Sequence, residues 1–531
     1  MEVRSLLLLS LSDCELTWFA NDRSLNIFVH ILDDDSLLNI FYFCRPITLD
    51  DDGADILQII EDNDWDHECW WYKLAHVCRR WRWLILTSAS LLRLSLLCTY
   101  STPMADMLAH SPPLPLVISY PDDDRDITTE DEEGITLAFQ LRHRIRGIRV
   151  VIPFIKLQKL IAAVDEEFPM LEYLVIRPQT SPNSALTLPN SFQAPGLRHI
   201  VLFNFASPIG SPLFTSCTGL ISLVLIDSRS SPYFHPDNLL QQLSLLPHLK
   251  TLIINFHSPV PNRDVERQLL DRPIITDVTL PNLREFWFGS VSAYLEAILP
   301  RMTMPLLNLL EFRFFHQLNF SIPHLLQFMG AAENLRFSSA KFRFSQGSLD
   351  IEVYPRDGAV THAFKTEISC KHLDWQVASA AQISHALRAV FSSVEFLTLE
   401  SSKLPISSET DNEADRTQWR KLLGSFSNVK TLRIHDDFRR QISRSLQVED
   451  GETPMEMLSE LKVLECQAPD GPENPFNTFI NARKNAGHPV TLVCPPRPRP
   501  RPPSYPNLPP PPPYPYLSRS PPPPPPPPPS P

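Results

Sequence analysis

A short apolar pattern recurs along most of this chain, and it limits the fold more than any other feature. An apolar residue is followed by two variable residues, an apolar residue, one variable residue and an apolar residue. The first seven copies begin 26, 26, 23, 29, 34 and 24 residues apart. Because one unit is too small to bury its own apolar face, the pattern predicts a stack of units with a continuous core. The copies are IRGIRV (145–150), LEYLVI (171–176), LRHIVL (197–202), LISLVL (220–225), LKTLII (249–254), LREFWF (283–288), LNLLEF (307–312), VEFLTL (394–399), VKTLRI (429–434) and LKVLEC (461–466).

Each hexamer is expected to form a short strand, and the segment after it a loop or helix that leads to the next strand. DNLLQQLSLL (237–246) and SAYLEAIL (292–299) are two such segments. The spacing is similar to that of leucine-rich repeats, with the irregularity that insertions produce. The stretch 313–393 is less regular, and we expect repeats with longer connections there.

The variable positions inside the hexamers are expected to face the open, concave side of such a sheet, because side chains alternate between the two faces of a strand. Trp287 is the strongest candidate for a substrate contact, since aromatic side chains anchor protein interfaces. The alternative, that late helices or the C-terminal tail cover this face, is equally open. The candidate positions are Tyr173, Val175, Arg177, His199, Phe203, Ile253, Asn255, Glu285 and Trp287.

Two amphipathic segments precede the hexamers. The first, SLLNIFYF (36–43), follows three aspartates that can cap a helix and favour its N-terminus. The second, KLAHVCRRWRWLI (73–85), is expected to be one helix with its arginines on the solvated face. Its apolar stripe consists of Leu74, Val77, Cys78, Trp81, Leu84 and Ile85.

These segments resemble an F-box, a helical domain with an aliphatic first helix and a Leu-x-x-Val-Cys-x-x-Trp helix. Two departures stand out: Asp33 replaces the usual proline, and the acidic insert 44–70 separates the helices. The resemblance implies that these helices bind a Skp-type adaptor protein and, through it, a cullin. The matching positions are Leu32, Leu37, Leu38, Ile40, Phe41, Leu74, Val77, Cys78, Trp81 and Leu84.

The whole chain resembles F-box proteins with irregular leucine-rich repeats, a type expanded in mushroom-forming fungi. That resemblance implies a substrate-receptor subunit of a Skp–cullin–F-box ubiquitin ligase, whose repeats hold an unknown protein substrate. Catalysis would reside in partner subunits, so no catalytic residue, cofactor or metal is expected here. The alternative is a non-catalytic repeat scaffold whose F-box is degenerate.

The expected fold class is α/β: a helical F-box, an irregular leucine-rich-repeat solenoid shaped like a horseshoe, and a disordered tail. The proline-rich tail could bind SH3, WW or profilin-like domains, or be an unselected extension. The segments are an N-terminal extension (1–24), an F-box-like domain (25–98), a linker or first repeat cap (99–140), a repeat domain (141–493) and the tail (494–531).

Composition narrows the remaining functional classes. A net charge of −12 opposes general nucleic-acid binding, which depends on neutralising phosphates. No apolar run reaches the length of a membrane span, so no membrane partner is expected. Nine dispersed cysteines indicate thiols in a reducing compartment, the cytoplasm or nucleus. The sequence contains neither a Gly-x-Ser-x-Gly elbow nor a phosphate-binding loop, so these motifs give no reason to expect an enzyme.

Overall fold

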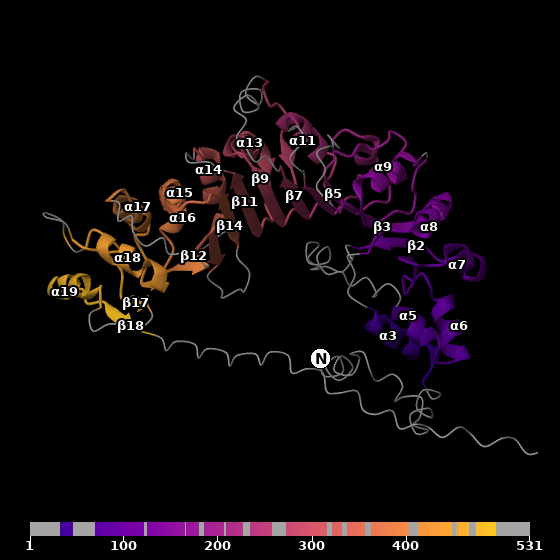
Figure 1. Ribbon diagram of the computed structural model, residues 1–531, viewed down its shortest axis with the longest axis horizontal. Helices are drawn as coiled ribbons and strands as arrows, with labels where there is room; N and C mark the ends of the chain where they lie inside the picture. Colours follow the sequence, from indigo (N-terminus) through magenta and orange to yellow (C-terminus); the bar gives the residue numbers. More distant parts are fainter. Residues whose placement is uncertain are drawn as a thin grey trace, which may run out of the picture.

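The computed structural model is an α/β protein built on one large, mostly parallel sheet. Figure 1 shows the sheet and its helices as an arch, with α3, α5 and α6 at one foot and β18 at the other. The N-terminal extension, most of the acidic insert and the proline-rich tail after Cys494 lie outside the described residues. The structure describes residues 32–494 except for 46–69, 122–124, 165, 180–184, 206–208, 227–233, 257–271, 316–320, 332–336, 356–362, 403–412, 449–452, 454 and 467–473.

Every hexamer contains a strand of the large sheet, which confirms that part of the prediction. The sheet begins earlier than the hexamers do, because β1 and β2 pair in parallel ahead of β3. In spatial order the strands are β1 (Leu96–Cys98), β2 (Leu116–Tyr120), β3 (Ile145–Ile152), β4 (Tyr173–Pro178), β5 (His199–Phe203), β6 (Ser222–Ile226), β7 (Thr251–Asn255), β9 (Glu285–Ser290), β11 (Leu309–Phe315), β14 (Phe364–Ser369), β13 (Ser348–Pro355), β12 (Phe337–Ser345), β15 (Phe396–Ser402), β16 (Thr431–Ile434), β17 (Val463–Cys466) and β18 (Thr491–Val493). Short strands β8 (Val278–Thr279) and β10 (Met302–Thr303) form a separate pair.

Helices cover the outer face of the arch (Figure 1). Packed helices need about 8–10 Å each, whereas neighbouring strands lie about 4.8 Å apart, so crowding on the helical side bends the sheet away from it. The α-helices after the N-terminal module are α7 (Met104–His110), α8 (Thr129–Gln140), α9 (Phe154–Ala162), α10 (Pro212–Ser216), α11 (Pro236–Leu243), α13 (Ser292–Ile298), α14 (Pro323–Ala331), α15 (Leu373–Ala386), α16 (Arg388–Phe391), α17 (Glu413–Gly424), α18 (Arg439–Ser445) and α19 (Asn477–Asn485). Short 3-10 helices are η2 (Arg142–Arg144), η3 (Leu299–Arg301) and η4 (Asp436–Phe438).

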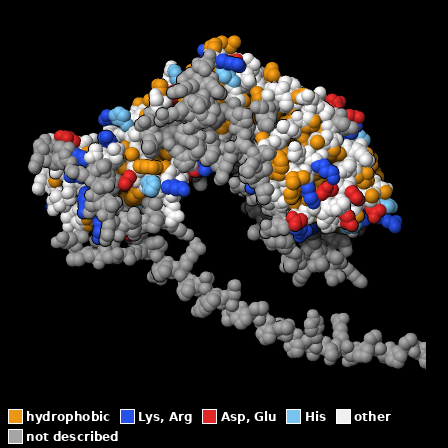
Figure 2. Space-filling model, turned by 45° about the horizontal axis from the view of Figure 1, so that its top comes forward, with side chains coloured by type: hydrophobic (Ala, Val, Ile, Leu, Met, Phe, Trp, Pro, Cys, Tyr) orange, Lys and Arg blue, Asp and Glu red, His pale blue; other side chains and the backbone are white. Residues whose placement is uncertain are grey.

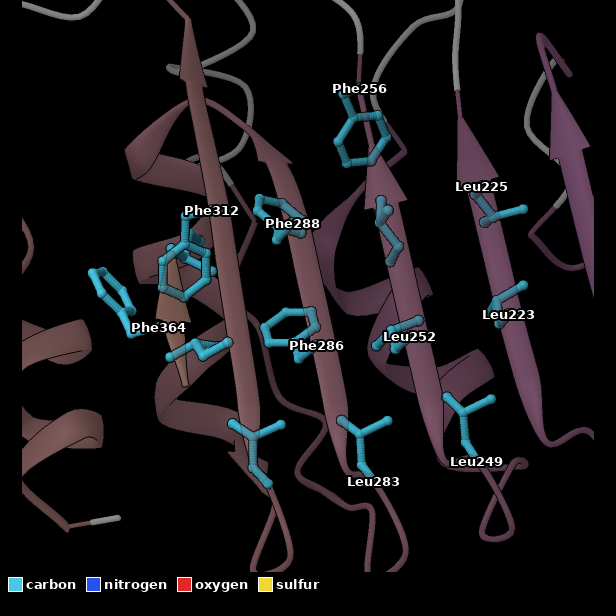
Figure 3. Close-up of a cluster of buried hydrophobic side chains, with 14 of the residues drawn as sticks. Leu223, Leu225, Leu249, Leu252, Phe256, Leu283, Phe286, Phe288, Phe312 and Phe364 are labelled. Atoms are coloured by element: carbon cyan, nitrogen blue, oxygen red, sulfur yellow. The ribbon is translucent and has the colours of Figure 1, made fainter. Parts of the chain in front are cut away.

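The apolar hexamer positions form the core between the sheet and these helices. Figure 3 shows them aligned across β6, β7, β9 and β11, with leucines giving way to phenylalanines. Ring centroids of Phe286 and Phe312 lie 6.3 Å apart, and those of Phe312 and Phe364 lie 6.1 Å apart. Burying each such side chain stabilises the fold by about 1.5–3 kcal/mol. The apolar side chains of neighbouring strands therefore contact one another across the sheet and form one continuous core.

The stretch 313–393 contains an antiparallel insertion instead of the longer repeat connections that we expected. From β11 the chain passes α14 to β12, returns through β13 and comes back through β14. β13 is antiparallel to both of its neighbours, whereas β12 and β14 run parallel to the main sheet. The insertion keeps the sheet continuous, because β14 pairs with β11 and β12 with β15.

Candidate functional site

The first candidate surface is the N-terminal helical module, α3 (Asp34–Cys44), α5 (Trp70–Ala75) and α6 (Arg79–Thr87). Asp33 is the N-cap of α3, and its carboxylate accepts a hydrogen bond from the Ser36 amide at 2.7 Å. That contact lowers the pKa of Asp33. The predicted aspartate cap at the start of this helix is therefore confirmed.

The motif of residues 74–81 is not one continuous helix, contrary to our expectation. α5 ends at Ala75, and Cys78 has an extended backbone with φ −157° and ψ 170°. The Cys78 thiol caps α6 by accepting a hydrogen bond from the Trp81 amide at 3.4 Å. Arg82 Nε donates to the Ala75 carbonyl at 3.0 Å, which satisfies the C-terminal end of α5. The cap at the end of α5 and the cap at the start of α6 thus split the predicted helix in two, although its apolar residues keep helical spacing throughout.

Contacts between α3 and α6 hold the module together. The rings of Phe41 and Trp81 meet edge to face, 4.9 Å between centroids. Arg80 donates to Asp34 Oδ1 at 2.6 Å and to the Leu32 carbonyl at 2.6 Å. The expected exposure of the arginines is found for Arg79 and Arg82, whereas Arg80 is half-buried and contacts α3. The N–H of Trp71 also donates to the Ser95 carbonyl at 3.1 Å, which ties α5 to the start of the sheet.

The ten predicted adaptor-binding residues differ widely in exposure. Leu37, Phe41 and Leu84 are buried, and Val77 is 53% exposed. The remaining six are half-buried: Leu32, Leu38, Ile40, Leu74, Cys78 and Trp81. Large apolar side chains that the motif did not single out are also exposed: Tyr42 at 47%, Phe43 at 78% and Trp83 at 60%. Their position off the core-facing stripe was the signal that could have identified them.

The second candidate surface is the inner face of the sheet. Register places Val175, Val201, Val224, Ile253 and Trp287 side by side on β4, β5, β6, β7 and β9. The four aliphatic residues form an apolar cluster separate from the main core. We call these five residues the inner apolar row. Phe203 and Ile226 flank it, half-buried.

The predicted concave-side residues all lie on this inner face, but to different depths. Tyr173, His199 and Asn255 are each 5% exposed, as is Val175, and Ile253 is 3% exposed. Phe203, Glu285 and Trp287 are half-buried, and Arg177 is exposed. His199 Nδ1 lies 3.2 Å from the Ser222 hydroxyl of the next strand. Trp287 thus remains the large aromatic side chain of the row that is partly accessible.

Charged side chains continue the inner face beyond β9. Arg313 pairs with Glu367 at 3.1 Å, Lys341 with Glu400 at 2.9 Å, and Arg343 with Glu352 at 3.5 Å. Asp350 and Glu367 lie opposite each other on β13 and β14. Burial raises the pKa of both carboxyls, even though the charges of Lys365 and Arg313 oppose both shifts. The inner face is therefore apolar over β4–β9 and ionic over β11–β15.

A basic pair lies at the N-terminal end of the inner apolar row. Arg149 on β3 is opposite Val175 in register, and Arg177 is two residues further along β4. Burial and the neighbouring Arg177 charge lower the pKa of Arg149 to about 10. Arg177 also lies over the Phe203 ring, 5.3 Å from its centroid. From β3 towards β15, the inner face therefore presents positive charge, then the inner apolar row, and then charges of both signs.

The outer face has a different character. Figure 2 shows positive and negative side chains intermingled on its N-terminal part. Lys156 pairs with Glu132 at 2.9 Å, and Arg142 pairs with Glu166. This part of the surface does not gather one sign of charge. Among the described residues, no group of three or more His, Cys, Asp or Glu is placed to hold a metal ion. No described helix is both long and apolar enough to cross a bilayer.

Neither a family model nor a curated protein matches this chain at a significant level. Function must therefore be inferred from the residues themselves and from where the fold places them.

Proposed function

We propose that this protein is a substrate-receptor subunit of a Skp–cullin–F-box ubiquitin ligase, resident in the cytoplasm or nucleus. In this proposal the N-terminal module is the F-box and the arch is an irregular leucine-rich-repeat horseshoe. One observation carries this proposal: a small helical module with exposed apolar side chains is joined to a curved sheet with its own apolar inner row. Two separate protein-binding surfaces on one chain suit a subunit that brings two partners together.

The module supplies what an adaptor contact requires. Leu37, Phe41 and Leu84 stabilise the packing of the helices, while Phe43, Val77 and Trp83 leave apolar surface open. Apolar and aromatic side chains of this kind dominate binding energy at protein interfaces. Because α5 is tied to β1 through Trp71, a bound adaptor would hold the whole arch in a defined orientation. Proximity of a substrate to the charged enzyme then accelerates transfer without a catalytic residue in this chain.

The decisive experiment is co-purification of full-length protein with a Skp-type adaptor. We expect the wild type to capture the adaptor and a Phe43→Ala, Trp83→Ala double variant to lose about tenfold or more in affinity. The melting temperature should change little, because both side chains are mostly exposed. Ile155→Ala on α9 is the matched control, since Ile155 is 81% exposed and lies outside the module. Trp81 is a poorer choice for substitution, because its ring packs on Phe41.

A wild-type protein that captures no adaptor would refute the proposal. Unchanged capture by the double variant would instead remove these two residues from the docking surface. The second candidate function is a repeat scaffold with a degenerate F-box, favoured by Asp33 in place of proline and by the burial of Leu37 and Phe41. Adaptor capture without a cullin in the same complex would select that alternative.

A further inference from the structure

Two cysteines meet at the C-terminal foot of the arch. β17 and β18 pair in parallel, with Leu464 opposite Leu492 and Glu465 opposite Val493. The next residues in this register are Cys466 and Cys494. Opposed residues on neighbouring strands lie about 4.8 Å apart, within the range of about 4.4–6.8 Å between Cα atoms that a disulfide spans. The pairing register therefore brings these two thiols together, although they are far apart in sequence.

The two thiols interact, and their environments differ. Cys466 is 2% exposed, whereas Cys494 is exposed. Burial raises the pKa of the Cys466 thiol to about 11, and the Cys494 thiol beside it contributes through a hydrogen bond and its charge. Thiolate fraction and access control thiol reactivity. The pair thus combines one exposed cysteine with one buried cysteine.

We propose that Cys466 and Cys494 form a reversible disulfide when the protein meets a peroxide. The Cys494 thiol loses its proton, its thiolate attacks one peroxide oxygen, and the O–O bond breaks; Cys494 becomes a sulfenic acid, and the departing hydroxide takes up that proton and leaves as water. The Cys466 thiol then attacks that sulfur, forms the S–S bond and releases a second water. The two thiols lose two electrons and two protons, and hydrogen peroxide is reduced to two waters. A thiol reductant restores both cysteines by exchange.

Other uses of the two thiols fit less well. Two sulfurs are half of the four ligands of a closed zinc site, and among the described residues no third ligand joins them. The buried thiols elsewhere have different neighbours: Cys98 lies 3.6 Å from the Tyr120 hydroxyl, and Cys217 donates to the Phe214 carbonyl at 3.5 Å. The pair at Cys466 and Cys494 is thus chemically distinct from those buried thiols.

The disulfide would fix the last strand of the sheet. β18 has three residues, and Thr491 and Val493 are exposed. Its pairing includes a hydrogen bond from the Thr491 amide to the Lys462 carbonyl at 2.8 Å. A strand this short at the edge of a sheet opens easily. Oxidation would close a loop around α19 and hold β18 against β17.

Peptide mapping of the full-length protein tests the proposal directly. The protein is treated with hydrogen peroxide, its free thiols are blocked, and it is digested without reductant. We expect a peptide linked through Cys466 and Cys494 that disappears after reduction, and slower hydrogen exchange in β18 of the oxidised protein. Absence of that link while Cys494 becomes sulfinic acid, or a Cys494 link to another cysteine, would overturn the proposal.

Single substitutions distinguish the role of Cys494, which reacts with the peroxide, from that of Cys466, which then forms the disulfide. Cys494→Ser should abolish the linked peptide and leave Cys466 reduced, because the exposed cysteine is gone. Cys466→Ser should leave Cys494 as a sulfenic acid that a dimedone probe traps, because no second sulfur resolves it. Cys44→Ser is the control, since this half-buried cysteine at the end of α3 should not change the link. If a Cys466 variant is unstable, the wild-type map and Cys494→Ser still decide the outcome.

Discussion

Gly147 lies on β3 directly beside Tyr173 of β4, and its lack of a side chain leaves room for the tyrosine ring. A Cβ at Gly147 would overlap the Tyr173 ring. We therefore expect Gly147→Ala to destabilise the protein by about 1–3 kcal/mol through overpacking. Denaturant unfolding measures the loss. The chain requires glycine here because of space, not because of backbone conformation.

A double-mutant cycle checks the cause of that loss. In a Tyr173→Ala background the ring is absent, so the additional cost of Gly147→Ala should fall towards zero. An equal cost in both backgrounds would mean that the glycine matters for another reason.

Individual contacts in the module show which residue roles sequence can predict. A cap from the aspartates 33–35 was predicted because they directly precede the apolar pattern, and the partner that the structure gives Asp33, Ser36, is only three residues away. The pairing of Arg80 with Asp34 was missed, because those residues are separated by 46 positions and by the acidic insert. A local pattern carries no information on a partner that only the fold brings near.

At the scale of elements, the reversed strand β13 and its neighbour β14 carry an electrostatic cost. Burial raises the pKa of Asp350 above its ordinary 3.8 and that of Glu367 above its ordinary 4.5. The folded state therefore holds protons that the unfolded state has lost, so these groups reduce stability as pH rises through the acid range. Asp350→Asn should gain stability relative to wild type as pH rises from about 4 towards neutral. Thermal unfolding at several pH values measures this difference.

Glu132 on α8 provides a control of opposite sign. Its pKa is lowered, chiefly by the hydrogen bond from Lys156, so its charge stabilises the fold above the acid range and that contribution disappears as pH falls. Glu132→Gln should therefore lose stability relative to wild type as pH rises. Identical pH trends for the two variants would contradict the account of Asp350.

The secondary-structure elements were predictable from the sequence where the spacing of apolar residues alone determines the local structure. Each hexamer formed a strand, because its apolar positions alternate towards the helical side. The spacing of apolar residues did not predict two features. The stripe from Leu74 to Ile85 has helical spacing on both sides of Cys78, so periodicity alone does not reveal the break that the cap introduces. The direction of β13 depends on its partners across the sheet, and an alternating strand reads the same in either direction.

At the scale of the whole molecule, the arch separates its two candidate contact surfaces. The module lies at the N-terminal foot of the arch (Figure 1). The inner apolar row crosses the strands from β4 to β9. The sequence could not predict how deeply each side chain of that row is buried. Small aliphatic side chains on neighbouring strands bury one another, so Val201 and Val224 are fully buried on a face that the pattern predicts to be open. Among the five residues of the inner apolar row, Trp287 is half-buried, whereas the other four are buried.

This geometry predicts that Trp287 contributes to substrate binding and not to adaptor binding. We expect full-length Trp287→Ala to capture the adaptor as the wild type does. The amount of each specific co-purifying protein should fall by about tenfold or more. Quantitative mass spectrometry of crosslinked complexes measures both. Trp375→Ala is the matched control, because Trp375 is 51% exposed on α15, on the helical side of the sheet. If both tryptophan variants retain the wild-type set of bound proteins, the inner apolar row is not the substrate surface; if Trp287→Ala also loses the adaptor, the two surfaces are not independent.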